Sequence, residues 1–158
     1  MTKGKEKRAL LVCLLLPVLG GALVGWLTRS GMADFARLDQ PPLSPPGWLF
    51  PVVWSVLYLL MGLASWLVYR AAAPQPRRRR ALIVYGVQLL VNWIWPILFF
   101  HGDWYLLSFC WLVALWLLVL ATVFCFGRCD RRAAWLLIPY LLWLSFAAYL
   151  NFAIYLLN

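Results

Sequence analysis

The polar side chains best suited to hold a ligand recur at helical spacing within one apolar stretch. Gln88, Asn92, Trp95 and Phe99 follow one another at intervals of four, three and four residues. At 100° per residue these side chains lie within an arc of about 60° on one face of a helix. An amide can hydrogen-bond the polar edge of a molecule while aromatic rings stack on its flat surface. This face is therefore a candidate site for a flat, hydrophobic ligand.

Two further apolar stretches each carry a similar face of aromatic and polar side chains. The first consists of Trp54, Tyr58, Met61 and Ser65, and the second of Tyr140, Trp143, Ala147 and Asn151. Pointing all three faces inward satisfies their polar groups. Two interpretations stay open: the faces line a pocket, or they only join helices by hydrogen bonds worth about 1 kcal/mol each.

The elements that position these faces are predicted to be membrane-spanning helices. Of the 158 residues, 65% are hydrophobic and 12% are charged, whereas soluble domains have about 25% charged residues. A charged side chain at the bilayer centre is costly, so intervals without charge predict the spans. We expect an all-α integral membrane protein, a five transmembrane helix bundle forming a single domain over residues 1–158. The helices are expected at about residues 9–28, 47–69, 81–101, 104–126 and 133–156.

The basic residues predict the orientation, because Lys and Arg are retained on the cytoplasmic side of a membrane. Twelve of the fourteen lie in the N-terminal segment and in the second and fourth connections. This places the N-terminus in the cytoplasm and the C-terminus on the opposite side. The formal net charge of +9 then reflects orientation and attraction to anionic lipids, and predicts no nucleic-acid binding. A cleaved signal peptide is disfavoured, because the first apolar run is longer than a signal core.

The first connection, Arg29 to Gly47, is long and is a candidate lid. Pro41, Pro45 and Pro46 favour a stiff, extended chain, although a plain linker fits the same composition. The sequence predicts no metal site, because Cys125 and Cys129 could share a helix face but two thiols alone make a poor metal site. His101 at a helix end is expected to be solvated rather than to bind haem iron. No conventional catalytic constellation or required cofactor is expected.

Three sequence blocks resemble the TspO/MBR family, which comprises the tryptophan-rich sensory proteins and translocator proteins (peripheral-type benzodiazepine receptors). The blocks are Pro45 to Trp54 with Leu57-Tyr58 and Met61-Gly62; Gln88 to Asn92 with Trp95 and Phe99-Phe100; and Pro139 to Trp143 with Phe146-Ala147 and Leu150-Asn151. They occur in the family's order and extend over nearly the whole chain.

The resemblance implies a five-helix bundle, often dimeric, that binds porphyrin or haem-related tetrapyrroles as ligands. It implies a pocket lined by Trp54, Tyr58, Gln88, Asn92, Trp95, Tyr140, Trp143 and Ala147. Its lid would contain Phe35, Pro41, Pro45 and Pro46. A homodimer is expected, and small surfaces for close helix approach are offered by Ala114, Ala121, Ala133, Ala134, Ala147 and Ala148.

The resemblance implies a receptor or sensor that affects tetrapyrrole homeostasis or stress response. Two alternatives stay open: a light-dependent porphyrin-degrading enzyme, with Trp143 as the catalytic residue, and a porphyrin or lipid transporter. The loop departs from the family pattern, with Leu43 at an aromatic position and Gln40 at a basic one. No basic residue follows Tyr149 or Tyr155 as a sterol motif requires. Specific sterol recognition is therefore not predicted.

Overall fold

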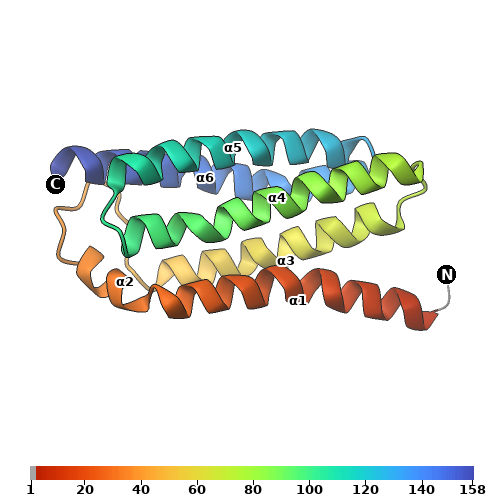
Figure 1. The fold of residues 1–158 in the computed structure, drawn as a ribbon, viewed down its shortest axis with the longest axis horizontal. Helices are drawn as coiled ribbons and strands as arrows, with labels where there is room; N and C mark the ends of the chain where they lie inside the picture. Colours follow the sequence, from red (N-terminus) through yellow and green to blue (C-terminus); the bar gives the residue numbers. More distant parts are fainter. Residues whose placement is uncertain (1–2) are drawn as a thin grey trace.

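The computed structural model describes residues 3–158, in which five long helices form an elongated bundle and one short helix caps one end (Figure 1). The helices are α1 (Lys3–Leu27), α2 (Arg29–Phe35), α3 (Leu49–Arg70), α4 (Gln75–Phe100), α5 (Tyr105–Gly127) and α6 (Arg131–Leu157). The five long helices are each apolar and long enough to cross a membrane. They confirm the prediction of an all-α, multi-pass integral membrane protein.

Charged segments extend the helices beyond the predicted spans. α4 begins at Gln75 and not near residue 81. Pro76 lies in its first turn, where a backbone N–H would have no partner within the helix, so the missing N–H of proline costs nothing. α1 likewise begins at Lys3 and not near residue 9. The predicted bounds marked where charges stop. That limit belongs to the hydrocarbon layer, whereas a helix can continue into the headgroup region.

The prediction that Arg29 to Gly47 is a loop was wrong for its first part, because Arg29–Phe35 forms α2. Packing on α4 explains this helix. A Cβ atom added to Gly31 would lie 1.8 Å from the backbone oxygen of Phe100, so only glycine permits the observed approach. The remainder of the connection is tied to α6, since the Tyr149 hydroxyl donates to the Pro42 carbonyl at 2.8 Å.

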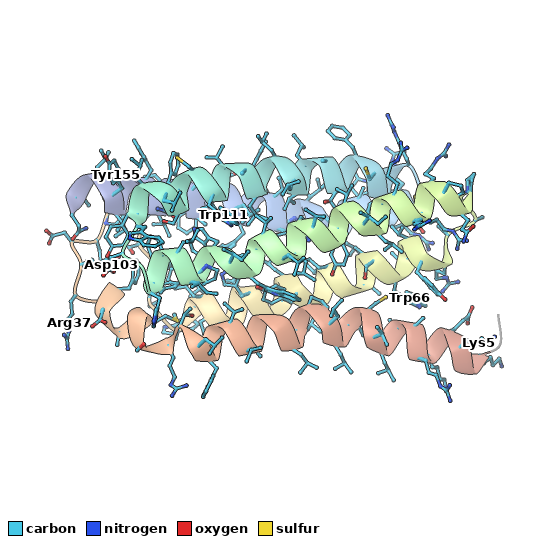
Figure 2. The ribbon with its side chains drawn as sticks, in the orientation of Figure 1. Lys5, Arg37, Trp66, Asp103, Trp111 and Tyr155 are labelled. Carbon is cyan, nitrogen blue, oxygen red and sulfur yellow. The ribbon has the colours of Figure 1, made fainter. Side chains whose placement is uncertain are left out.

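The arrangement of the bundle separates the two ends of the molecule. α5 packs on both α4 and α6, and α3 packs on both α1 and α6, while α4 makes smaller contacts with α1 and α3. Lys5 lies at one end, and Arg37, Asp103 and Tyr155 lie at the other (Figure 2). The α3–α4 and α5–α6 connections share the end of Lys5 (Figure 1). The basic segments therefore gather at one end of the bundle, and the start of α1 and the end of α6 lie at opposite ends of it.

Buried alanines restrict how two copies of the chain could pack together. Ala133 and Ala147 are buried inside the bundle, so they cannot provide the surface for helix approach between chains. Ala114 and Ala121 on α5 are exposed and lie seven residues apart, which places them on one helix face.

Candidate functional site

A cavity of about 400 Å³ lies between α1, α3 and α4, with α2 at one end. Its volume falls within the usual range for small-molecule sites, about 300 to 1,000 Å³. Five aromatic rings contribute to its lining: Phe50, Trp54, Tyr58, Trp95 and Phe100. The described lining residues include hydroxyl and indole groups but no charged side chain. This chemistry suits a flat, largely apolar ligand.

Small residues of α1 form one wall of this cavity. A Cβ atom added to Gly21 would lie 2.1 Å from the ring of Tyr58, so glycine lets the phenol approach the backbone of α1. Gly25 also lines the cavity, but a Cβ atom there would have no heavy atom within 4 Å. Gly25 therefore leaves space that a ligand can occupy.

A buried hydrogen-bond network lies behind Tyr58. The Tyr58 hydroxyl donates to Asn92 Oδ1 at 2.7 Å, and Asn92 Nδ2 donates to the Tyr140 hydroxyl at 2.7 Å. The Tyr140 hydroxyl in turn donates to Gln88 Oε1 at 3.0 Å. All four residues are buried. The network joins α3, α4 and α6, and it holds the phenol that forms part of the cavity wall.

A second buried network holds Trp95, another ring of the cavity. Trp95 Nε1 donates to Asn151 Oδ1 at 3.0 Å, and Asn151 Nδ2 donates to the Tyr105 carbonyl at 2.8 Å. The Ser108 hydroxyl lies 3.1 Å from Asn151 Oδ1. These contacts join α4, α5 and α6. Each network thus fixes one aromatic side chain that lines the cavity.

The structure divides the eight predicted pocket residues into three groups. Trp54, Tyr58 and Trp95 line the cavity. Gln88 and Asn92 lie behind it, where each forms a hydrogen bond with the Tyr140 hydroxyl. The contacts of Gln88 and Asn92 therefore fit the interpretation that the polar faces join helices by hydrogen bonds.

Trp143 and Ala147 lie on α6, outside the lining of the cavity. The ring of Trp143 meets the ring of Phe50 edge to face, with 6.0 Å between centroids. Because Phe50 lines the cavity, one ring separates Trp143 from it. Trp143 Nε1 is buried and has no hydrogen-bond partner among residues 3–158.

The predicted lid residues also lie outside the lining. Phe35 packs on Phe50 and Phe100, with centroids 6.1 and 5.8 Å apart, and so supports two rings of the cavity wall. Pro41 is buried, Pro45 is half-buried and Pro46 is exposed. From this connection it is Met32 of α2 that reaches the cavity.

Sequence reasoning missed the contribution of α1 and of Thr28 directly after it. α1 supplies Val18, Gly21, Ala22, Val24 and Gly25 to the lining. A signal was present, because Gly21, Ala22 and Gly25 are small residues at helical spacing, typical of a close-packed face. Among residues 3–158, no group of three His, Cys, Asp or Glu side chains is placed to hold a metal ion.

Comparison with known proteins places this arrangement in a family. The model of the TspO/MBR family matches residues 13–157. The chain belongs to the TspO/MBR family. It is 36% identical over 124 residues to the tryptophan-rich protein TspO of Chlorobaculum tepidum, and this match covers 78% of each chain. It is 36% identical over 143 residues to the translocator protein of Bos taurus, covering 87% of this chain and 83% of that one.

An archaeal member of the TspO/MBR family matches over almost its full length. The tryptophan-rich protein TspO of Archaeoglobus fulgidus is 35% identical over 150 residues, covering 94% of this chain and 96% of that one. These matches confirm the family resemblance drawn from the three sequence blocks.

Proposed function

We propose that this protein is a membrane receptor or sensor that binds a porphyrin-type tetrapyrrole in the cavity between α1, α3 and α4. The observation that carries the proposal is the cavity of about 400 Å³ walled by five aromatic rings. Membership of the TspO/MBR family supports a role in binding and sensing. We propose an effect on tetrapyrrole homeostasis or stress response as the consequence of binding.

The chemistry of the lining determines how such a ligand would lie. A flat macrocycle would stack against Trp54 and Trp95, because offset or edge-on contact with aromatic rings is favourable. Its carboxylates would stay at the mouth, since burying an unpaired charge is costly. Arg29 directly follows the lining residue Thr28 and is exposed. Its guanidinium lies over the Trp26 ring and donates one hydrogen bond to the Trp26 carbonyl, and its remaining N–H groups can pair with a carboxylate.

A cavity-filling variant tests this proposal. Protoporphyrin is titrated in the dark into the purified protein, and quenching of tryptophan fluorescence is measured. We expect saturation at one ligand per chain. Gly25→Leu places a side chain in the open space of the cavity and is expected to weaken binding at least about tenfold, which is about 1.4 kcal/mol.

Gly86→Leu is the matched control for Gly25→Leu. A Cβ atom at Gly86 also meets no heavy atom within 4 Å, but Gly86 lies outside the cavity lining. Its affinity for protoporphyrin is expected to equal that of the wild type. Equal affinities in all three proteins would show that this cavity does not hold the ligand.

One contact supports a second candidate function, light-dependent porphyrin degradation. The edge-to-face contact of Trp143 with Phe50 would place an indole one ring away from a bound porphyrin. Loss of porphyrin absorbance under light, abolished in Trp143→Phe, would favour this enzymatic function over simple binding.

We further propose that the end of the bundle with the basic segments faces the cytoplasm, because twelve of the fourteen Lys and Arg residues lie in the segments there. Alkaline phosphatase fused after Asn158 tests this, since that enzyme is active only outside the cytoplasm. An inactive fusion would reverse the proposed orientation.

A further inference from the structure

Arginines from two helices converge on a second cavity, at the basic end of the bundle. This cavity of about 320 Å³ lies between the start of α4 and the end of α5. Arg77 and Arg80 of α4 line it, together with Arg128, which directly follows the last residue of α5. Ala81 and Cys125 complete its lining together with Pro76. The lining of this cavity thus combines three arginine side chains with uncharged residues.

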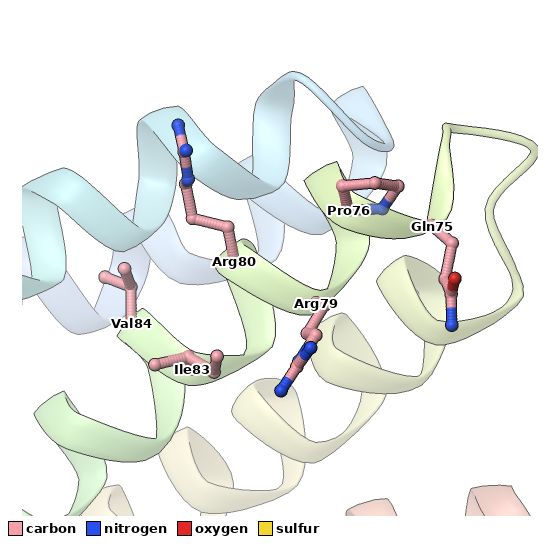
Figure 3. Close-up of a pocket in the computed structure, with 6 residues that line it drawn as sticks. All are labelled: Gln75, Pro76, Arg79, Arg80, Ile83 and Val84. Atoms are coloured by element: carbon pink, nitrogen blue, oxygen red, sulfur yellow. The ribbon is translucent and has the colours of Figure 1, made fainter.

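A neighbouring cavity of about 410 Å³ shares Arg80 and extends along the outer surface of α4. Figure 3 shows that the side chains of Arg79 and Arg80 leave α4 in different directions, toward α3 and α5. Ile83 and Val84 lie one turn further along the helix, away from the end of the bundle (Figure 3). The guanidinium groups of Arg79 and Arg80 therefore lie next to the apolar surface formed by Ile83 and Val84, on its side nearer the end of the bundle.

The protein supplies no carboxylate to these arginines among its described residues. The ion pairs of residues 3–158 are Arg37 with Asp34 and Arg132 with Asp130. The first turn of α4 contains no acidic residue, although the N-terminus of a helix carries partial positive charge. Four successive arginines at this helix start therefore repel one another and the helix dipole. A bound anion would relieve this repulsion.

We propose that the cavity between α4 and α5 binds the phosphate group of an anionic phospholipid. Guanidinium groups bind phosphate through paired N–H donors, and two helices present them here from both sides. Ala81 begins the charge-free part of α4, so the cavity lies at headgroup level. The apolar surface at Ile83 and Val84 lies where the acyl chains begin. Free phosphate shares the headgroup chemistry but gains nothing from that surface.

Competition between lipids tests the proposal. The delipidated protein in detergent is offered equal amounts of phosphatidylglycerol and phosphatidylcholine, and bound lipid is counted by native mass spectrometry. We expect the wild type to retain phosphatidylglycerol preferentially. Arg80→Gln/Arg128→Gln is expected to lose affinity for it about tenfold, because two charge-assisted contacts are removed.

Arg8→Gln/Arg131→Gln is the charge-matched control. Arg8 and Arg131 are exposed residues of the basic N-terminal segment and of the start of α6, outside both cavities. Removing them changes the net charge equally, and phosphatidylglycerol affinity is expected to fall by no more than about threefold through the loss of diffuse attraction. An equal loss in both double variants would show diffuse attraction only and overturn the site.

Two further measurements keep the result interpretable. Arg80→Lys/Arg128→Lys keeps the charge but loses the paired donors, so its phosphatidylglycerol affinity is expected to lie between those of the wild type and the glutamine variant, even if the latter folds poorly. Inorganic phosphate is added as a competitor. Displacement of the lipid by phosphate at equal concentration would assign the cavity to a free anion and overturn the lipid proposal.

Discussion

The amide of Asn92 donates a hydrogen bond of 2.7 Å to the hydroxyl of Tyr140, joining α4 to α6 inside the bundle. Tyr58 bonds to the same amide from α3. With Gln88 as the final acceptor, these buried groups satisfy one another. Polar side chains in the middle of an apolar bundle can therefore have a structural role without contacting a ligand.

Tyr140→Phe tests the structural role of this network. The change leaves Asn92 Nδ2 and Gln88 Oε1 without their partner, and unpaired buried groups cost about 1 to 3 kcal/mol. We expect a lower free energy of unfolding, measured by denaturation in detergent. Tyr149→Phe is the control, because this hydroxyl donates to the Pro42 carbonyl at an exposed position. Equal losses in the two variants would contradict a special contribution of the network.

Gly62→Ala tests the close contact between α1 and α3. A Cβ atom at Gly62 would lie 2.6 Å from the Cys13 carbonyl oxygen and 2.8 Å from Leu14 Cα. Both are backbone atoms, so the helices must separate, and overpacking of this kind costs about 1 to 3 kcal/mol. Thermal unfolding is expected to show the loss. Gly86→Ala, which meets no neighbour, is expected to be as stable as the wild type or more stable; destabilisation there would weaken the packing argument.

Trp143→Phe separates binding from photochemistry. Trp143 lies outside the cavity lining, so its replacement is expected to change dark affinity for protoporphyrin less than about threefold, under 1 kcal/mol. Trp54→Ala removes a ring that lines the cavity and is expected to weaken binding more. Fluorescence titration measures both. A larger loss of protoporphyrin affinity in Trp143→Phe than in Trp54→Ala would indicate that the ligand binds nearer to α6.

Asp130 is expected to make the start of α6 sensitive to acid. Its carboxylate caps the helix by accepting from the backbone N–H of Arg132 at 2.9 Å. The Arg132 guanidinium, hydrogen-bonded to the same carboxylate, lowers the pKa of Asp130 below its ordinary value. Stability from this group is present above its unfolded pKa, about 3.9. It is lost as pH falls through the lower folded pKa.

Asp130→Asn isolates this contribution, because an asparagine can still cap the helix but does not titrate. Thermal unfolding of the wild type and variant is compared between neutral and acidic pH. The wild type is expected to lose more stability in acid than the variant. The same acid-dependent loss in both proteins would assign it to other carboxylates.

Much of the fold could be predicted from the sequence, because a bilayer imposes a simple rule. Charged side chains are excluded from the hydrocarbon, so the positions of the basic and acidic residues determined five spans. The spacing of Trp54 and Tyr58, and of Asn92 and Trp95, determined which side of each helix faces the interior. Both are local properties of the chain and require no knowledge of which helices are neighbours.

The location of the cavity depended on tertiary packing. Gln88 and Asn92 had the chemistry for a ligand, but only the three-dimensional arrangement placed Tyr58 and Tyr140 within hydrogen-bond distance of them. The open space lies instead beside α1, where a Cβ atom added to Gly25 would meet no heavy atom within 4 Å. A cavity is the volume that several helices leave unfilled, so its position follows from their mutual packing and from no single helix.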